Sequence, residues 1–231
     1  YLDKLKNKID FFEISTSCSL MHLPYSLENE EALDQNLKSI LSFGDEKLNE
    51  IALLKESIIS GGISTDIEKY TDNMIKANQV LEGRVVNQVR ERVNNLTDDM
   101  FMRVEDRQER LDIQIEKIGI PNLPTTTIGS FPQTAETRLL RRRLRFGEIE
   151  TDEYVKGVKE IIKETVEIQE SLGLDILVHG EAERNDMVEY FGELLNGFAF
   201  TSNGWVQSYG SRCVKPPIIY GDVFRESKMT V

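Results

Sequence analysis

Two short polar segments of the chain carry residue types that could bind a charged small molecule. Gly129 precedes Ser130, and such a pair lets backbone amides approach a ligand closely while the hydroxyl donates to a carboxylate oxygen. Glu181 follows Gly180 at the end of an apolar run, where its carboxylate could pair with an ammonium group in a charge-assisted contact. The two segments together suit the two ends of an amino acid. The alternatives are a tight turn at Ser130 and a solvated loop with internal Glu–Arg pairing around Glu181.

The histidines and cysteines do not form a recognisable metal-binding motif. His179 could bind a metal, but His22 is the only other histidine, and Cys18 and Cys213 are the only cysteines, with no C-x-x-C or H-x-x-x-H spacing. We therefore expect His179 to be a hydrogen-bonded core residue. No general base is visible beside Cys213, which argues against a nucleophilic cysteine. Two cysteines in unrelated contexts predict free thiols and a reducing, cytoplasmic compartment.

The composition excludes several classes of partner. The chain has 231 residues, of which 39% are hydrophobic, and this is enough for a globular core. Its formal net charge of −12 disfavours nonspecific binding to nucleic acid and to anionic membranes. No apolar stretch approaches the roughly 20 residues that span a bilayer. A small molecule is therefore the expected kind of partner.

One basic cluster interrupts this acidic composition, and it consists of Arg138, Arg141, Arg142, Arg143 and Arg145. Such a cluster could attract an anionic substrate tail. A helix distributes consecutive residues around its circumference, however, so most of these arginines cannot face one ligand. We therefore expect a solvated face with ion pairs.

The second half of the chain predicts a strand, two helices and a second strand. Residues 125–131 are rich in β-branched types and end in a Gly-Ser loop, and residues 175–179 form an apolar run suited to a buried parallel strand. Between them we expect helices over 135–146 and 151–172, the second of which ends at Gly173. This order is a βαβ unit, which requires a parallel sheet. A (β/α) barrel and a doubly wound sheet both contain such a unit.

The first half of the chain is expected to be mainly helical. A short buried strand is predicted over 11–20, and helices that end at glycines are predicted over 34–59 and 65–81. Residues 84–118 carry apolar side chains three or four positions apart, which predicts an amphipathic helical region. This region could be a coiled-coil surface for a partner, but its short, interrupted seam favours packing against its own protein.

Three longer blocks occur in order along the chain: TTTIGSFPQT at 125–134, VHGEAERNDMVEYFG at 178–192 and NGWVQSYGSRCVKPP at 203–217. They closely resemble the opening of the C-terminal barrel of the cobalamin-independent methionine synthases. Upstream, the run STSCSLMH at 15–22 and the helices after it resemble the last part of that family's N-terminal barrel and the connection between its barrels. The resemblance covers nearly all of the chain and is weaker before Pro121.

This resemblance implies an α/β fold, with a partial (β/α)8 TIM-type barrel in residues 121–231, after the break at Pro121 and Pro124. Residues 1–83 would then be the end of the N-terminal barrel, and residues 84–120 a long interdomain helical region. Both ends of the chain look like cuts within a longer protein. Because a split barrel leaves a sheet edge exposed, we expect self-association.

The resemblance also implies transfer of a methyl group from 5-methyltetrahydropteroyltriglutamate to homocysteine, which gives methionine. It places the amino acid against residues that follow the ends of two barrel strands, where (β/α) barrels carry their reactive groups; these are Ile128, Gly129, Ser130 and Glu181. It places the folate against Arg212 and Cys213. The family uses zinc, and no cobalamin, to convert the homocysteine thiol into a thiolate.

The family's zinc ligands are a histidine, a glutamate and two cysteines in later strands of its barrel, and they have no counterpart in this sequence. We therefore predict that the 231-residue chain alone neither binds catalytic zinc nor transfers methyl groups. Two other interpretations are a catalytically inactive structural segment and a related zinc-barrel alkyltransferase. The block at 203–217, which resembles a folate site, argues against the second of these.

Overall fold

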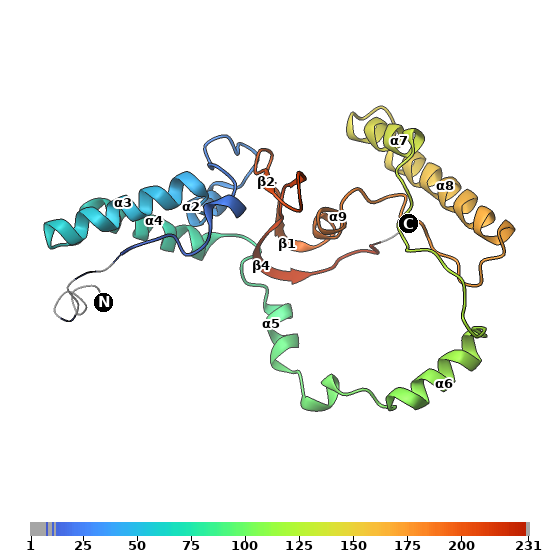
Figure 1. Ribbon diagram of the computed structural model, residues 1–231. Helices are drawn as coiled ribbons and strands as arrows, with labels where there is room; N and C mark the ends of the chain where they lie inside the picture. Colours follow the sequence, from blue (N-terminus) through green and yellow to red (C-terminus); the bar gives the residue numbers. More distant parts are fainter. Residues whose placement is uncertain (1–7, 9–10, 12, 230–231) are drawn as a thin grey trace. The chain divides into compact units, whose positions relative to one another are not determined.

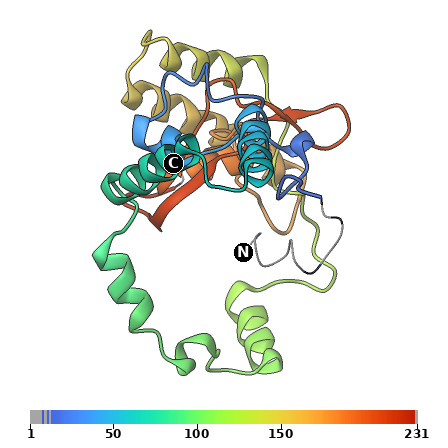
Figure 2. The ribbon, with the colours of Figure 1, turned by 90° about the vertical axis from the view of Figure 1, so that its left-hand side faces the viewer.

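The computed structural model describes residue 8, residue 11 and residues 13–229 (Figures 1 and 2). The chain is an α/β protein in which helices predominate and the strands are few and short. It divides into two compact units. Unit 1 comprises Tyr1–Glu91 and Val188–Glu226, and unit 2 comprises Arg92–Met187 and Ser227–Val231.

The first part of unit 1 contains three helices, which are α2 (Gln35–Ile40), α3 (Gly44–Ser60) and α4 (Thr65–Val80). The side chain of Ser64 caps α4 by accepting the N–H of Ile67, and Gly83 lies beyond its end at a φ of 73°. The helix predicted over 65–81 is therefore confirmed. α4 packs against α2 and α3 (Figure 1).

The single helix predicted over 34–59 is wrong, because the chain breaks it between α2 and α3. The N–H groups of Gly44 and Asp45 donate to the carbonyls of Pro24 and Tyr25, both at 2.9 Å. The Glu46 carboxylate then accepts the N–H of Phe43 at 3.1 Å and so caps the start of α3. Apolar spacing continues across this break, so periodicity alone does not reveal it.

The strand predicted over 11–20 is also wrong for the part of it that the structure describes. Residues 11 and 13–19 form no strand, and a 3-10 helix, η1 (Leu20–His22), follows them. Thr16 Oγ1 donates to the carbonyl of Cys18 at 2.7 Å, and Ser19 Oγ accepts the N–H of Met21 at 3.3 Å. Hydroxyl side chains thus bind the backbone locally, in competition with strand pairing. Residue 12 lies outside the described residues.

The second part of unit 1 begins with α9 (Met187–Glu193), whose first residue belongs to unit 2, and contains two short antiparallel pairs of strands. β1 (Asn196–Ala199) pairs with β4 (Ile218–Phe224), and β2 (Val206–Gln207) pairs with β3 (Cys213–Val214). Ala199 of β1 and Ile218 and Tyr220 of β4 pack against the hydrophobic core of unit 1. This core consists of Leu27, Leu33, Leu37, Phe43 and Leu81. The hydrophobic core of unit 1 therefore joins segments from both halves of the chain.

The amphipathic region predicted over 84–118 is helical, but it is not one helix. It consists of α5 (Asn87–Asn94), the 3-10 helix η2 (Asp98–Phe101) and α6 (Arg107–Ile118), which are separate pieces in Figures 1 and 2. Neither α5 nor α6 buries a residue, and Val104 between η2 and α6 is 95% exposed. Among the described residues, the expected packing against the same protein is found at the start of the region, where Val86 and Val89 are partly buried and Arg90 pairs with Asp222 of β4 at 2.7 Å, and not along α6, which buries no residue.

Unit 2 is built on two long helices, α7 (Ala135–Arg145) and α8 (Thr151–Ser171), as the sequence predicts. They pack closely, because a Cβ added to Gly157 would lie 2.7 Å from a methyl carbon of Leu140. Val158 is buried on α8. Gly173, at a φ of 70°, follows the end of α8 in the left-handed conformation that glycine tolerates, as expected.

The two strands predicted in unit 2 are not regular strands, although their segments run in parallel. The N–H of Ile176 donates to the carbonyl of Thr125, and the N–H of Phe131 donates to the carbonyl of Gly180, both at 3.0 Å. Between them, Ser130 and Gly180 form an isolated parallel bridge. The parallel arrangement of 125–131 and 175–180 agrees with the expected βαβ order. The pairing is too short and irregular to form a strand ladder, so the regular strands were wrongly predicted.

A side chain of α8 takes the place of a neighbouring strand beside Val178. Gln169 is 1% exposed, and its amide nitrogen donates to the carbonyl of Val178 at 2.9 Å. Its amide oxygen accepts the N–H of Val178 at 2.8 Å. The backbone groups of this residue, which a longer sheet would pair, are therefore satisfied from the helix.

Replacing Gln169 with leucine should destabilise unit 2. The substitution leaves the partly buried N–H and carbonyl of Val178 without these partners, which costs about 1–3 kcal/mol. The measurement is thermal unfolding of the chain followed by circular dichroism. The control is Glu170→Leu, which introduces the same side chain at an exposed neighbouring position and should change the midpoint much less. Equal midpoints for both variants would show that the Gln169 amide contributes nothing.

Asp175 should make the stability of unit 2 depend on pH. Its carboxylate accepts the N–H and the hydroxyl of Thr125, and these hydrogen bonds hold the pKa of Asp175 below its ordinary value of 3.8. A lowered folded-state pKa stabilises the fold fully above the unfolded pKa, and the stabilisation is lost as the pH falls through the folded pKa.

We therefore expect Asp175→Asn to lower the unfolding midpoint at pH 7 and at pH 5. The difference from the unsubstituted chain should shrink below pH 3.8, the ordinary pKa of this carboxyl group. Circular dichroism melts at several pH values measure it, with Asp72→Asn on the exposed face of α4 as the control. A difference that stays constant down to the lowest pH would contradict the role of the carboxylate charge.

Candidate functional site

The segment Ile128–Ser130 forms an open turn near the end of segment 125–131, which runs parallel to segment 175–180. Gly129 has a φ of 106°, which a residue with a side chain rarely adopts. Ile128 is 98% exposed, and Ser130 is exposed while its backbone bridges to Gly180. The turn thus leaves the Ser130 side chain exposed while its backbone is held in place.

Glu181 lies directly beside this turn, on the neighbouring segment. Its backbone has a φ of 58°, and its N–H donates to His179 Nδ1 at 3.3 Å. Its Oε1 lies 3.8 Å from the position that a Cβ of Gly129 would occupy. The Nε and Nη2 groups of Arg184 both bind the other oxygen, Oε2. The structure therefore brings Glu181 next to Gly129 and Ser130.

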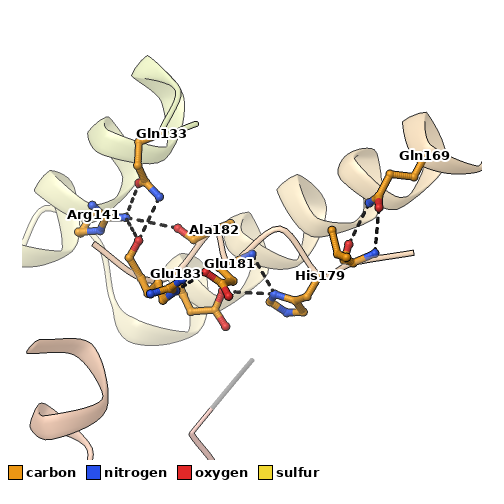
Figure 3. Close-up of polar contacts among 9 residues, drawn as sticks. Gln133, Arg141, Gln169, His179, Glu181, Ala182 and Glu183 are labelled. Carbon is orange, nitrogen blue, oxygen red and sulfur yellow. Dashed lines mark hydrogen bonds and ion pairs between the residues drawn. The ribbon is translucent and has the colours of Figure 1, made fainter. Parts of the chain in front are cut away.

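A partly buried polar network holds the Glu181 loop in place, and Figure 3 labels Gln133, Arg141 and Ala182 among its members. Arg141 Nη2 donates to Gln133 Oε1 at 2.6 Å and to the carbonyl of Ala182 at 3.3 Å. Gln133 Nε2 donates to the carbonyl of Arg184 at 3.0 Å. Gln133, just before α7, and Arg141, within α7, thus connect this helix to the loop that carries Glu181. Sequence reasoning missed this connection, because nothing in the sequence distinguishes Arg141 from the other arginines of α7.

The arginine cluster of α7 otherwise behaves as predicted. Arg143 pairs with Glu153 at 3.2 Å, and the guanidinium of Arg142 lies 5.7 Å from the ring centre of Phe146. Arg141 instead turns inward and lies near Tyr154. Burial raises the pKa of the Tyr154 hydroxyl above its ordinary value of 10.0, and the positive charge of Arg141 opposes that rise. The arginines therefore do not converge on one ligand.

Glu183 is the buried carboxylate of the loop, and it lies close to the partly exposed His179. The Glu183 side chain is only 4% exposed, and its Oε2 lies 3.7 Å from His179 Nδ1. Because Nδ1 already accepts the N–H of Glu181, it cannot at the same time donate to Glu183. His179 is hydrogen-bonded as predicted, but its side chain is 37% exposed and so is not a core residue.

These residues do not form a metal site. Across residues 13–229, no three or more histidine, cysteine, aspartate or glutamate side chains gather in a way that could hold an ion. The accepting nitrogen of His179 is engaged by a backbone N–H, and one oxygen of Glu181 is engaged by Arg184. The zinc that the family resemblance implies therefore does not fit the described side chains.

Arg212 and Cys213 lie in unit 1, on the β2–β3 hairpin. The N–H of Ser208 donates to the carbonyl of Arg212 at 2.8 Å, and Cys213 pairs with Gln207 across the hairpin. Both cysteines of the chain are exposed free thiols. Lys215, just after the hairpin, lies 5.3 Å from the ring centre of Trp205. Arg212 and Cys213 are adjacent and exposed, and Ser130 and Glu181 belong to the other unit.

The base of this hairpin is anchored by a buried carboxylate. Glu30 is fully buried, and its two oxygens accept the N–H groups of Ser202 at 2.6 Å and Asn203 at 2.8 Å. These contacts link the N-terminal part of unit 1 to the segment that leads into β2. Sequence reasoning did not identify Glu30, because a single glutamate in a polar stretch gives no signal.

A hollow of about 360 Å³ in unit 2 lies between the helices and the paired segments. Phe131, Gln133, Thr165, Gly180 and Ala182 are among the residues that line it, whereas Gly129, Ser130 and Glu181 are not. The predicted amino-acid site is therefore at the open edge of the paired segments.

No helix within the described part of the chain is long and apolar enough to cross a membrane.

Comparison with known proteins assigns the chain to a family. Residues 123–231 match the family described as the catalytic domain of cobalamin-independent synthase. A Catharanthus roseus 5-methyltetrahydropteroyltriglutamate–homocysteine methyltransferase is 50% identical over 224 residues, which cover 96% of this chain and 29% of that protein. A protein of the same name from Paraburkholderia xenovorans is 51% identical over 94% of the chain and 28% of its own length.

An Arabidopsis thaliana relative, 5-methyltetrahydropteroyltriglutamate–homocysteine methyltransferase 2, is 50% identical over 96% of the chain. The chain thus spans less than a third of the length of the relatives it matches, at 28% or 29% of each. The match includes all three blocks that suggested the resemblance. The chain therefore belongs to the cobalamin-independent methionine synthase family.

Proposed function

We propose that this chain binds homocysteine and methionine as part of an enzyme that transfers a methyl group from 5-methyltetrahydropteroyltriglutamate to homocysteine. The observation that carries the proposal is the position of the Glu181 carboxylate, 3.8 Å from the Cβ position of Gly129 and next in space to the Ser130 segment. The names of the relatives, which are methyltransferases acting between these two substrates, support the same reaction.

In this arrangement, each charged group of the amino acid has a protein group that can bind it. The ammonium binds Glu181, whose Oε1 carries no guanidinium contact, in a charge-assisted hydrogen bond. The carboxylate accepts from the Ser130 hydroxyl and from the backbone at Gly129, whose lack of a side chain permits close approach. Ile128, which is almost fully exposed, offers an apolar surface for the side chain of the substrate.

The remaining assignments follow from the family. We place the folate at Arg212 and Cys213, which are both exposed on the β2–β3 hairpin. The parallel segments 125–131 and 175–180 would be the first two strands of a (β/α)8 barrel over 121–231. Residues 1–83 would close an N-terminal barrel, and 84–120 would connect the two.

Zinc is not part of the chemistry that we derive for these residues, since the described side chains do not fit it. The family is cobalamin-independent by its description, and we propose that zinc, in a complete enzyme, is held by ligands outside this chain. A cytoplasmic location is supported by the two free cysteines. Self-association through the open edge of the paired segments remains a prediction.

Replacing Glu181 with glutamine should weaken binding of L-homocysteine to the 231-residue chain. Loss of a charged hydrogen bond costs about 1.5–3 kcal/mol, or roughly a 10- to 100-fold rise in Kd. NMR titration with ¹⁵N-labelled chain measures this change even for millimolar binding. The control is Glu170→Gln, which removes an exposed carboxylate of α8 and should leave Kd unchanged.

A second ligand tests whether the ammonium is the group that Glu181 binds. The analogue 4-mercaptobutanoate lacks the amine, so its binding should be weak and unaffected by Glu181→Gln. If the substitution leaves L-homocysteine affinity unchanged, or weakens both ligands equally, Glu181 does not bind the ammonium. An absence of binding to the unsubstituted chain would favour the structural-segment interpretation.

The purified 231-residue chain should neither bind zinc tightly nor make methionine. Its described side chains bring together no set of three or more metal ligands, and a thiol is largely protonated at neutral pH without a metal. The measurements are equilibrium dialysis with zinc and a methionine assay with both substrates. The Catharanthus roseus relative serves as the positive control. Methionine formation by the chain with added zinc would refute the prediction.

A further inference from the structure

The Glu181 carboxylate has two oxygens in different surroundings. Oε2 accepts both the Nε and the Nη2 groups of Arg184. Oε1 faces Gly129, at 3.8 Å from the position where a Cβ would stand. The Arg184 side chain is 18% exposed and that of Glu181 is 34% exposed, so the pair is mostly removed from solvent. An ion pair in such surroundings is screened less than one on the open surface.

Arg184 is itself fixed by the surrounding network. Its N–H donates to the carbonyl of Glu181 at 3.3 Å, which closes a turn between the two charged residues. Its carbonyl accepts Gln133 Nε2 at 3.0 Å and Arg141 Nη2 at 3.5 Å. One donor lies just before α7 and the other lies within it, and a hydrogen bond of 2.6 Å joins them. The backbone beneath the guanidinium is therefore held at several points.

We propose that Arg184 is a positioning residue for substrate binding: it holds Oε2 of Glu181 so that Oε1 stays directed towards Gly129 and Ser130. This inference rests on the proposed function, in which Oε1 receives the ammonium of the amino acid. A glutamate has several rotatable bonds, and fixing it before the ligand arrives reduces the ordering cost of binding. Both guanidinium contacts go to one oxygen, and this leaves the other available.

The opposite role would be that of a competing counter-ion. In that case Arg184 would have to leave Glu181 before the ammonium could bind, and its removal would tighten binding. The two roles predict changes of opposite sign. The single-oxygen contact favours positioning, because the guanidinium does not occupy the oxygen that faces Gly129.

The test is an NMR titration of the 231-residue chain with L-homocysteine. We expect Arg184→Gln to raise Kd about 10-fold, and Arg184→Lys to restore part of the affinity because an ammonium can still bind Oε2. The control is Arg138→Gln, at an exposed position of α7, which should leave Kd unchanged. An unchanged or lowered Kd in Arg184→Gln would overturn the proposal.

A double substitution separates positioning from general structural support. If Arg184 acts through Glu181, the pair Glu181→Gln with Arg184→Gln should bind no more weakly than Glu181→Gln alone. Full additivity of the two losses would overturn the proposal and indicate a structural role for Arg184.

A second measurement needs no ligand. The amide signals of Gly129 and Ser130 should shift in Arg184→Gln, return towards their original positions in Arg184→Lys, and stay in place in Arg138→Gln. Unchanged signals in Arg184→Gln would overturn the positioning role. If these signals shift as expected but the unsubstituted chain does not bind L-homocysteine, the proposed function fails and Arg184 still orients Glu181.

Discussion

The backbone pairing between Ser130 and Gly180 is the constraint on which the candidate site depends. The two segments are 50 positions apart, as the contact between Thr125 and Asp175 shows, and the chain between them forms α7 and α8. Closing a loop of this length costs conformational entropy, but the cost grows only slowly with length. Once the segments are paired, the end of one and the loop after the other must lie side by side. Glu181 then lies beside Gly129, and Gln133 and Arg141 hold its loop there.

Few backbone hydrogen bonds hold this pairing, so side chains supply the rest. Asp175 binds the backbone and hydroxyl of Thr125 at one end, and the Gln169 amide satisfies both backbone groups of Val178 in the middle. At the other end, Phe131 donates to the carbonyl of Gly180. In a complete sheet, neighbouring strands would make such contacts. Here the helix and the loops make them, and they keep two irregular segments in parallel.

The sequence predicts the local elements well where a strong periodic pattern coincides with helix-end signals. α4, α7 and α8 lie within a residue of their predicted ends. Ser64 and Thr134 cap the starts of α4 and α7, and a glycine follows each of the three helices, whereas the start of α8 has no side-chain cap. The break between α2 and α3 could not be predicted, since it depends on hydrogen bonds to Pro24 and Tyr25, about 20 residues upstream. The regular strands predicted over 11–20, 125–131 and 175–179 are absent from the described residues for a similar reason, because their residue types form regular strands only where partner strands of sufficient length are in place.

The residues of the candidate site also fall into those that the sequence predicts and those that it does not. Short motifs are enough to suggest Gly129, Ser130 and Glu181, since each depends on a local feature such as a glycine turn. Arg141, Gln133 and Glu30 could not be found in this way, because their importance comes from partners that are distant in the sequence. Arg184 was visible as a neighbour of Glu181, but the sequence does not say which oxygen it binds. Long-range polar contacts, and not residue types, decide what these side chains do.

Charge balance supports the proposal that a zwitterion binds at the Glu181 loop. Arg141 of α7 and Arg184 of the loop supply two positive charges beside the partly buried Glu181 and Glu183, so these four side chains balance in charge before a ligand arrives. An amino acid adds one charge of each sign and preserves that balance. A ligand with several negative charges would leave uncompensated charge near Glu183, which is costly to bury. The proposed folate, with its triglutamate tail, is therefore placed at the β2–β3 hairpin of unit 1, where Arg212 is exposed and Lys215 follows just after the hairpin.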